Sequence, residues 1–186
     1  SSLIVGLEDN NLKILNSFQT DSISLNYDEL KFISTANEEN LNPNKLDDIY
    51  DALVLGTRDY VEKNGFKGVI IGSSGGIDSA LTTVIAHDAL GKEKVKTVMM
   101  PFDYTSDISL EDAKSLATNL GISHSEISIK EMFEAFNKGL STSFNGLKED
   151  KTEENLQSRC RGVTLMALSN KSVSYTHLRA HETYPH

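Results

Sequence analysis

Residues 68–79 read Gly-Val-Ile-Ile-Gly-Ser-Ser-Gly-Gly-Ile-Asp-Ser, and the fold expected for the rest of the chain follows from them. The first five residues form a short apolar run of the kind that is buried as a strand in a parallel sheet. The glycine- and serine-rich turn at 72–79 leads directly into a segment with helical spacing that ends at Gly91. We therefore expect a buried strand, a tight loop and a helix in direct succession.

The elements expected around this stretch alternate between helix and strand. Apolar residues recur at three- and four-residue spacing from Leu46 to Gly65, which predicts a helix before the first strand. Further strands are expected at 95–100 and 127–129, and further helices at 109–121, 130–140 and 152–170, with Ser109 and Thr152 as capping residues. This order predicts an α/β fold with a doubly wound parallel sheet, in which ligands bind at the carboxyl ends of the strands.

The N-terminal residues differ from the rest in composition. Two short apolar stretches, Leu3–Val5 and 12–15, flank a polar turn and predict a hairpin. Residues 35–44 have the composition of a linker, which places a domain boundary near residue 40. Between Glu8 and Asp51, ten acidic residues stand against three basic ones, so most of the formal net charge of −9 belongs to this solvated part. Non-specific binding to nucleic acid is not expected, because it requires excess positive charge.

Composition excludes several classes of protein. The chain has 186 residues, 38% hydrophobic and 24% charged, which suits one α/β domain with an appendage. We expect no signal peptide, and no apolar run approaches the roughly 18–20 residues of a bilayer span, so no membrane partner is expected. The lone cysteine, Cys160, excludes a disulfide framework and agrees with a cytoplasmic location. The sequence begins with Ser1 rather than Met, which suggests a fragment.

The loop at 72–79 has the chemistry of an anion site. Its glycines let backbone N–H groups approach phosphate oxygens, and the start of the following helix adds partial positive charge. The hydroxyls of Ser74 and Ser79 could donate further hydrogen bonds, and Asp78 could hold a cation that offsets phosphate charge. The loop lacks both the lysine of the Gly-x-x-x-x-Gly-Lys-Ser/Thr motif and the spacing of the dinucleotide fingerprint, so neither of those sites is predicted.

Two other interpretations of this loop remain open on the residues alone. Residues 72–76 also fit the Gly-x-Ser-x-Gly nucleophile elbow of serine hydrolases, with Ser74 as nucleophile and His87 or His124 as candidate base. That interpretation leaves Asp78 and Ser79 without a role. A non-catalytic nucleotide-binding module would use the same loop without needing a site for an acyl acceptor.

Residues 74–79, Ser-Gly-Gly-Ile-Asp-Ser, resemble the pyrophosphate-binding loop of the N-type ATP pyrophosphatases. Further stretches resemble the synthetase domain of the glutamine-dependent NAD⁺ synthetases, namely 52–60, 64–68, 98–101, 104–106, 109–113, 152–157 and 168–171. The resemblance implies the adenine nucleotide α-hydrolase-like fold for 41–171, as the N-terminal part of that domain. It also implies that 1–40 are the end of a nitrilase-like glutaminase domain and a linker.

The resemblance implies a ligase that amidates deamido-NAD⁺ to NAD⁺ through an acyl-adenylate, releasing AMP and pyrophosphate. ATP and Mg²⁺ would bind, ammonia would come from glutamine, and the full-length enzyme would be a homo-oligomer. The implied ATP-binding residues are Gly72, Ser73, Ser74, Gly75, Gly76, Ile77, Asp78 and Ser79, with Asp78 as the metal ligand. Asn155 and Arg159, one helical turn apart, would line the deamido-NAD⁺ site, where a guanidinium suits phosphate or carboxylate. No catalytic residue is assignable.

Two features of the sequence depart from the family, and one helix has an expected apolar face. Ser73 stands where the family commonly has Leu, and the pair Phe102-Asp103 replaces a small or basic pair. In the helix from Thr152, the apolar residues at 156, 160, 163 and 167 are expected to share one face, with Cys160 as a buried hydrophobe.

Residues 172–186 break the resemblance. The string from 173 to 183 is similar to a translated sequencing adapter, so we exclude it from the fold as a non-native tail. For the same reason we reject zinc binding by His177 and His181, although their four-residue spacing would suit a helix. Further metal and substrate residues of the family are expected beyond Lys171, so we expect no NAD⁺ synthesis from this chain alone.

Overall fold

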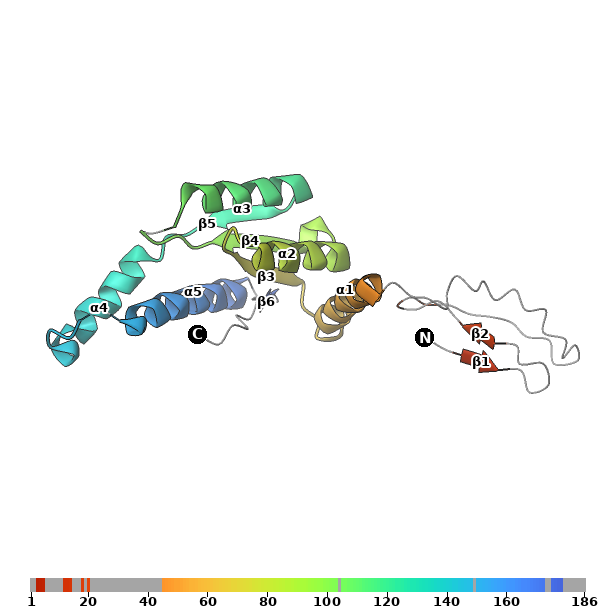
Figure 1. Ribbon diagram of the computed structural model, residues 1–186, viewed down its shortest axis with the longest axis horizontal. Helices are drawn as coiled ribbons and strands as arrows, with labels where there is room; N and C mark the ends of the chain where they lie inside the picture. Colours follow the sequence, from red (N-terminus) through yellow and green to blue (C-terminus); the bar gives the residue numbers. More distant parts are fainter. Residues whose placement is uncertain are drawn as a thin grey trace, which may run out of the picture. The chain divides into compact units, whose positions relative to one another are not determined.

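The computed structural model describes residues 3–5, 12–14, 18, 20, 45–103, 105–148, 150–172 and 175–178 (Figure 1). The chain divides into two compact units, Ser1–Gly56 and Thr57–His186. In the first unit, β1 (Leu3–Val5) pairs antiparallel with β2 (Leu12–Ile14), which confirms the predicted hairpin. The predicted linker at 35–44 lies outside the described residues, so the domain boundary near residue 40 stays a prediction.

The second unit is built on a parallel sheet with the strand order β5-β4-β3-β6 (Figure 1). From α1, which crosses the division between the units, the elements in chain order are α1 (Lys45–Lys63), β3 (Gly68–Ser73), α2 (Ile77–Leu90), η2 (Lys92–Lys94), β4 (Val95–Met99), α3 (Asp107–Leu120), β5 (Ser123–Glu126), α4 (Lys130–Phe144), α5 (Lys151–Lys171) and β6 (Tyr175–Leu178). The predicted order of helices and strands from 46 to 171 is confirmed. None of the described helices combines the length and the apolar character that a membrane crossing requires.

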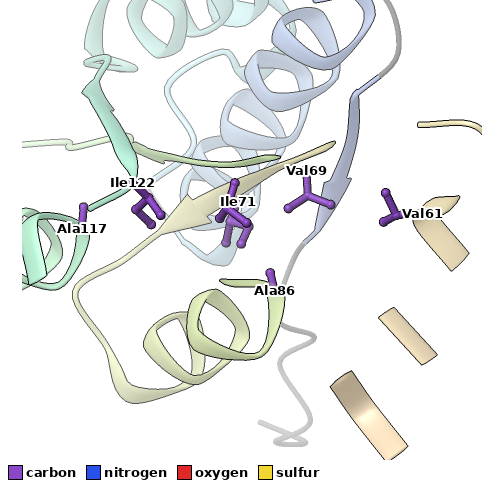
Figure 2. Close-up of a cluster of buried hydrophobic side chains, with 7 residues drawn as sticks. Val61, Val69, Ile71, Ala86, Ala117 and Ile122 are labelled. Carbon is purple, nitrogen blue, oxygen red and sulfur yellow. The ribbon is translucent and has the colours of Figure 1, made fainter. Parts of the chain in front are cut away.

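Alternate residues of β3 pack into two hydrophobic clusters on opposite faces of the sheet. Val69 and Ile71 lie in the cluster that includes Ala86 of α2 and Ala117 of α3 (Figure 2). Ile70 packs in a second cluster from β4 and the residue after it, α5 and the start of α4, namely Val98, Met100, Ile129, Phe133, Cys160 and Leu165. A strand that is covered by helices on both sides must be apolar throughout, because its side chains alternate between the faces. The doubly wound arrangement is thus confirmed, as is the buried position of Cys160, which is 2% exposed.

The predicted position of the third strand in this unit is wrong. The ladder of β5 with β4 ends where Met99 pairs with Glu126, before the apolar residues at 127–129. These residues instead run beyond the ladder, where Ile127 N donates to Met99 O at 2.9 Å and Ile129 is fully buried. The apolar spacing therefore marks the residues that reach the second cluster. The ladder itself is polar because β5 lies at the edge of the sheet.

Two helices begin before the residues that were expected to cap them. Ser106 caps α3, and its side chain accepts a hydrogen bond from Ser109 N. Asp150 caps α5 by accepting from Thr152 N at 2.7 Å, in a reciprocal capping box with Glu153. Ser109 and Thr152 are therefore the residues that are capped, because a good N-cap acceptor lies two or three positions upstream of each.

Strand β6 lies in the segment that we exclude from the fold on sequence grounds. It runs parallel to β3, with Gly68 opposite Tyr175 and Ile71 opposite Leu178. A strand ladder joins backbone groups, so an open strand edge accepts a segment of many different sequences. His177 stands in this strand rather than on a helix, and His181 lies outside the described residues. The non-native origin of residues 172–186 stays a prediction.

Candidate functional site

The loop predicted to bind an anion lies at the carboxyl edge of the sheet. Ser73 ends β3 and Ile77 begins α2, so only three residues connect them. Gly76 caps α2 without a side-chain hydrogen bond, and the first bond of the helix runs from Ala80 N to Gly76 O at 3.1 Å. The N–H groups of the first turn therefore precede the helical ladder, which is the arrangement that binds phosphate oxygens at a helix N-terminus.

A closed ring of hydrogen bonds shapes this loop. Ser79 Oγ donates to Gly76 O at 2.9 Å and accepts from Ser74 N at 3.2 Å. Gly76 N donates to Ser74 Oγ at 3.2 Å, and the two hydroxyl oxygens lie 3.1 Å apart. Each hydroxyl has one hydrogen, so Ser74 must direct its hydrogen at Ser79 when Ser79 directs its own at Gly76. Both hydroxyls and the N–H groups of Ser74 and Gly76 are thus engaged within the loop, so the N–H groups in the first turn of α2 are the better candidates to meet an anion.

Gly75 brings the start of α3 against the loop. Its φ is +75°, and a β-carbon added to it would lie 2.6 Å from Ser109 Cα and 2.8 Å from the Ser109 carbonyl carbon. Only glycine permits both this backbone conformation and this approach. The loop before α2 and the first turn of α3 are therefore in contact, and this contact between distant residues was not revealed by the sequence.

Gly72 allows α5 to approach the same end of β3 from the other face. A β-carbon at this position would lie 3.0 Å from Leu165 Cδ1 and 3.3 Å from Met100 Cε. Ser73, the departure from the family beside it, is buried at the end of the strand. The glycine is therefore needed for the packing of α5 and Met100 against this end of the strand.

Asp78 lies in the first turn of α2 and is exposed. Mg²⁺ usually keeps several waters and takes one or two carboxylates together with substrate phosphates. One exposed carboxylate beside a phosphate-binding loop therefore fits a metal that arrives with a nucleotide. Among the described residues, no three His, Cys, Asp or Glu side chains are grouped so as to hold a metal without one.

Phe102 and Asp103, the other departures from the family, hold the segment after β4 against α4. The ring of Phe102 meets that of Phe133 edge-on, with centroids 4.8 Å apart. Asp103 Oδ1 accepts a hydrogen bond from Lys130 Nζ at 2.8 Å, and this bond and the carboxylate charge raise the pKa of Lys130. The two residues therefore contribute to the position of the segment that leads into α3.

Asn155 and Arg159 lie on α5, and both are exposed. No hydrogen bond within the described residues joins either side chain to the loop at 72–79, so their role in a dinucleotide site stays a prediction. The expected apolar face of this helix is wrong in part, because Val163 and Ala167 are exposed. The buried residues are Cys160, Thr164, Leu165 and Ser169.

Arg161 is the arginine of α5 that reaches the carboxyl edge of the sheet, and sequence reasoning missed it. Its Nε donates to Met100 O at 3.2 Å, from a half-buried position. Arg161 precedes the core residue Leu165 by four positions, so the two lie on one side of the helix. Correct placement of Leu165 in the core would have distinguished Arg161 from the exposed Arg159.

The geometry gives no support to a serine hydrolase. Ser74 Oγ bonds within its own loop, as described above. His87 Nδ1 lies 3.1 Å from Asp88 Oδ1, and His124 Nδ1 lies 3.0 Å from Thr97 Oγ1. Within the described part of the chain, neither imidazole is placed to take a proton from Ser74.

The partial burial of His124 predicts a pH-dependent stability. Burial lowers the pKa of His124, against a smaller opposing effect of Glu126, and Lys114 lowers it slightly further. The unfolded chain then binds a proton that the folded chain resists, so stability falls as the pH drops through the unfolded pKa of about 6.5. In urea unfolding, we expect the urea concentration at the midpoint to be lower at about pH 5 than at about pH 7.5. This difference should be smaller in His124→Gln. His87→Gln is the control and should keep the decrease; an unchanged slope in His124→Gln would contradict the prediction.

Comparisons with known proteins agree with this fold. Residues 49–177 match the family model described as NAD synthase. The glutamine-dependent NAD(+) synthetase of Thermotoga maritima is 54% identical over 129 residues, which cover 69% of this chain and 22% of that protein. A solved glutamine-dependent NAD+ synthetase from Acinetobacter baumannii, in complex with ADP, has a TM-score of 0.68 at 51% identity over 69% of this chain and 24% of its own. The NH3-dependent NAD synthetase of Campylobacter jejuni has a TM-score of 0.61 at 28% identity over 70% of this chain and 54% of its own.

Proposed function

The chain belongs to the NAD synthase family, and on this basis we propose that the whole enzyme amidates deamido-NAD⁺ to NAD⁺ with ATP, using ammonia taken from glutamine. The chain spans 22% of the length of its Thermotoga maritima relative, so the activity is proposed for the whole enzyme. We expect no NAD⁺ synthesis from the chain alone. The observation that carries the proposal is the loop at 72–79, where the N–H groups at the start of α2 face the carboxyl edge of the sheet.

The proposed reaction has two steps. The nicotinate carboxylate of deamido-NAD⁺ attacks the α-phosphorus of ATP, and the bond to the β-phosphate oxygen breaks, releasing pyrophosphate. Ammonia then attacks the acyl carbon and AMP leaves. The charge that develops on the departing pyrophosphate requires donors that are already in place, because reorganising them during the reaction would raise the barrier. In our proposal the backbone N–H groups at the start of α2 are those donors, and the ring of Ser74 and Ser79 hydroxyls orders the loop that leads into them.

Asp78 is proposed to hold the metal that accompanies the nucleotide. Mg²⁺, when bound there, would supply charge neutralisation for the leaving pyrophosphate. An exposed carboxylate on the first turn of a helix is reachable from solvent, as binding of a metal–nucleotide complex requires. This role adds a metal ligand to the proposed ATP site, and it needs no further carboxylate from the described residues.

Asn155 and Arg159 are proposed to line the deamido-NAD⁺ site. Their support is their position on α5, which packs against β3 at Gly72, together with their exposure. A guanidinium can bind a phosphate or carboxylate with two parallel hydrogen bonds. A homo-oligomeric assembly and a cytoplasmic location also remain proposals of this family assignment.

The products of ATP cleavage test the proposal. The whole enzyme is incubated with MgATP, deamido-NAD⁺ and ammonium chloride, and its phosphorus products are measured by ³¹P NMR. We expect AMP and pyrophosphate in equal amounts with NAD⁺, because the leaving group is pyrophosphate. ADP and inorganic phosphate would reject the proposed class of reaction, and bound ATP without cleavage would favour a non-catalytic nucleotide-binding module.

A further inference from the structure

The carbonyl of Met100 lies where β3 and β4 separate. Beyond the ladder of β4 with β5, Met99 O and Pro101 O accept from Ile127 N and Ile129 N, at 2.9 and 3.2 Å. Successive carbonyls of an extended chain point to opposite sides, so Met100 O points toward β3 instead. β3 has ended at that level, since Ser73 opposite Met99 is its last paired residue. The ladder between the two central strands therefore stops just before Met100.

Arg161 donates to this carbonyl from α5. The bond joins residues 61 positions apart, from the half-buried guanidinium Nε to Met100 O. Met100 is 5% exposed, so water has little access to its carbonyl, and a buried acceptor without a partner is costly. Arginine remains charged at any pH in the working range of a protein, and its Nε–H lies in a rigid plane, so the bond defines a direction as well as a distance.

We infer that Arg161 is a positioning residue for the nucleotide loop, an inference that rests on the proposed function. By bonding Met100 O, it sets the point at which the chain leaves β4. Residues 101–103 and 105–106 lead from there to α3, whose cap is Ser106. The third residue of α3, Ser109, has its backbone against Gly75. The position of the loop at 72–79 thus depends on that of Met100 O, because a short segment and the start of α3 connect the two.

Hydrogen bonds of the described residues in the connecting segment limit how far a small displacement could be absorbed there. Phe102 N donates to Thr105 Oγ1 at 2.9 Å, and Thr105 N donates to Phe102 O at 2.8 Å, which closes a turn. Asp103 is bonded to Lys130 at the start of α4. Because Gly75 and Ser109 meet through backbone atoms, they cannot absorb a shift by rotating a side chain. Loss of the Arg161 bond should therefore loosen both the start of α3 and the loop.

Hydrogen–deuterium exchange and steady-state kinetics on the whole enzyme test this inference. Arg161→Met removes the donor, and Arg161→Lys keeps a charge while removing the planar Nε–H. In both, we expect faster exchange in the ligand-free enzyme at 74–79 and 106–109, and a kcat for ammonia-driven NAD⁺ synthesis lower by about tenfold or more. Arg58→Met is the matched control, because Arg58 Nε donates to Ala89 O at 2.8 Å at the opposite end of α2. It should leave both readouts at the wild-type level.

Several results would overturn the inference. Unchanged exchange at 74–79 with a raised KM for deamido-NAD⁺ would mean that Arg161 contacts substrate instead of positioning the loop. Wild-type exchange and kcat in Arg161→Lys would show that the Nε–H bond is not needed, and this variant decides if Arg161→Met does not fold. If the wild-type enzyme itself releases ADP and phosphate, the proposed function fails, and the exchange data still decide whether Arg161 orders the loop.

Discussion

Gly75→Ala is expected to lower the free energy of unfolding by about 2–5 kcal/mol and to abolish binding of magnesium pyrophosphate. A non-glycine residue at φ +75° costs about 1–2 kcal/mol by itself. The added methyl group would also overlap the backbone of Ser109, and overpacking of this kind typically costs about 1–3 kcal/mol. Relief requires the first turn of α3 to move away from the loop. The N–H groups at the start of α2, which begins two residues after Gly75, would then lose the arrangement that suits a phosphate.

Gly65→Ala is the matched control for this variant. Gly65 has a φ of +70°, but nothing lies within 4 Å of a β-carbon added there. Its substitution should therefore cost only the conformational strain, about 1–2 kcal/mol, and leave pyrophosphate binding intact. Urea unfolding measures the two stabilities, and titration calorimetry with magnesium pyrophosphate measures the binding. Equal destabilisation by the two variants, or binding retained in Gly75→Ala, would show that the contact with Ser109 is dispensable.

The central part of the fold was predictable because local signals there agree with tertiary structure. Val69, Ile70 and Ile71 are all buried, since β3 has helices on both faces, and this makes the strand evident as an apolar run. The glycines that follow it mark the turn into α2 with equal clarity. The location of the loop at the carboxyl edge then follows because the loop leaves the end of a strand in a parallel sheet.

Features that depend on distant partners were not predictable in the same way. The contact of Gly75 with Ser109 and the bond from Arg161 to Met100 join residues 34 and 61 positions apart. The position of β5 was predicted wrongly because its ladder is polar. The buried face of α5 was predicted wrongly because a threonine and a serine lie on it. Periodicity detects apolar faces, so it fails where polar residues are buried by packing against a strand end.

Asp78→Asn in the whole enzyme is expected to reduce NAD⁺ synthesis by about 10²–10⁴-fold. The substitution keeps the shape of the side chain but removes the negative charge that would hold Mg²⁺ beside the nucleotide phosphates. Loss of that charge leaves the departing pyrophosphate less well neutralised, so kcat should fall more than the affinity for deamido-NAD⁺. The measurement is ammonia-driven NAD⁺ formation at saturating deamido-NAD⁺, with the concentration of Mg²⁺ varied. Part of the lost rate should return at high Mg²⁺, since a weakened site can be refilled by mass action.

Asp88→Asn is the control, because Asp88 lies near the other end of α2 and is exposed, so the change in net charge is the same. It should leave the rate within about twofold of wild type, since an exposed charge so far from the loop is screened by solvent. A serine hydrolase makes the opposite prediction for this pair of measurements. Its turnover would be insensitive to Asp78, and a fluorophosphonate would label Ser74, whose hydroxyl is bonded to Ser79 and Gly76 in this structure. Covalent labelling of Ser74 with unchanged turnover in Asp78→Asn would therefore replace the ligase assignment by a hydrolase.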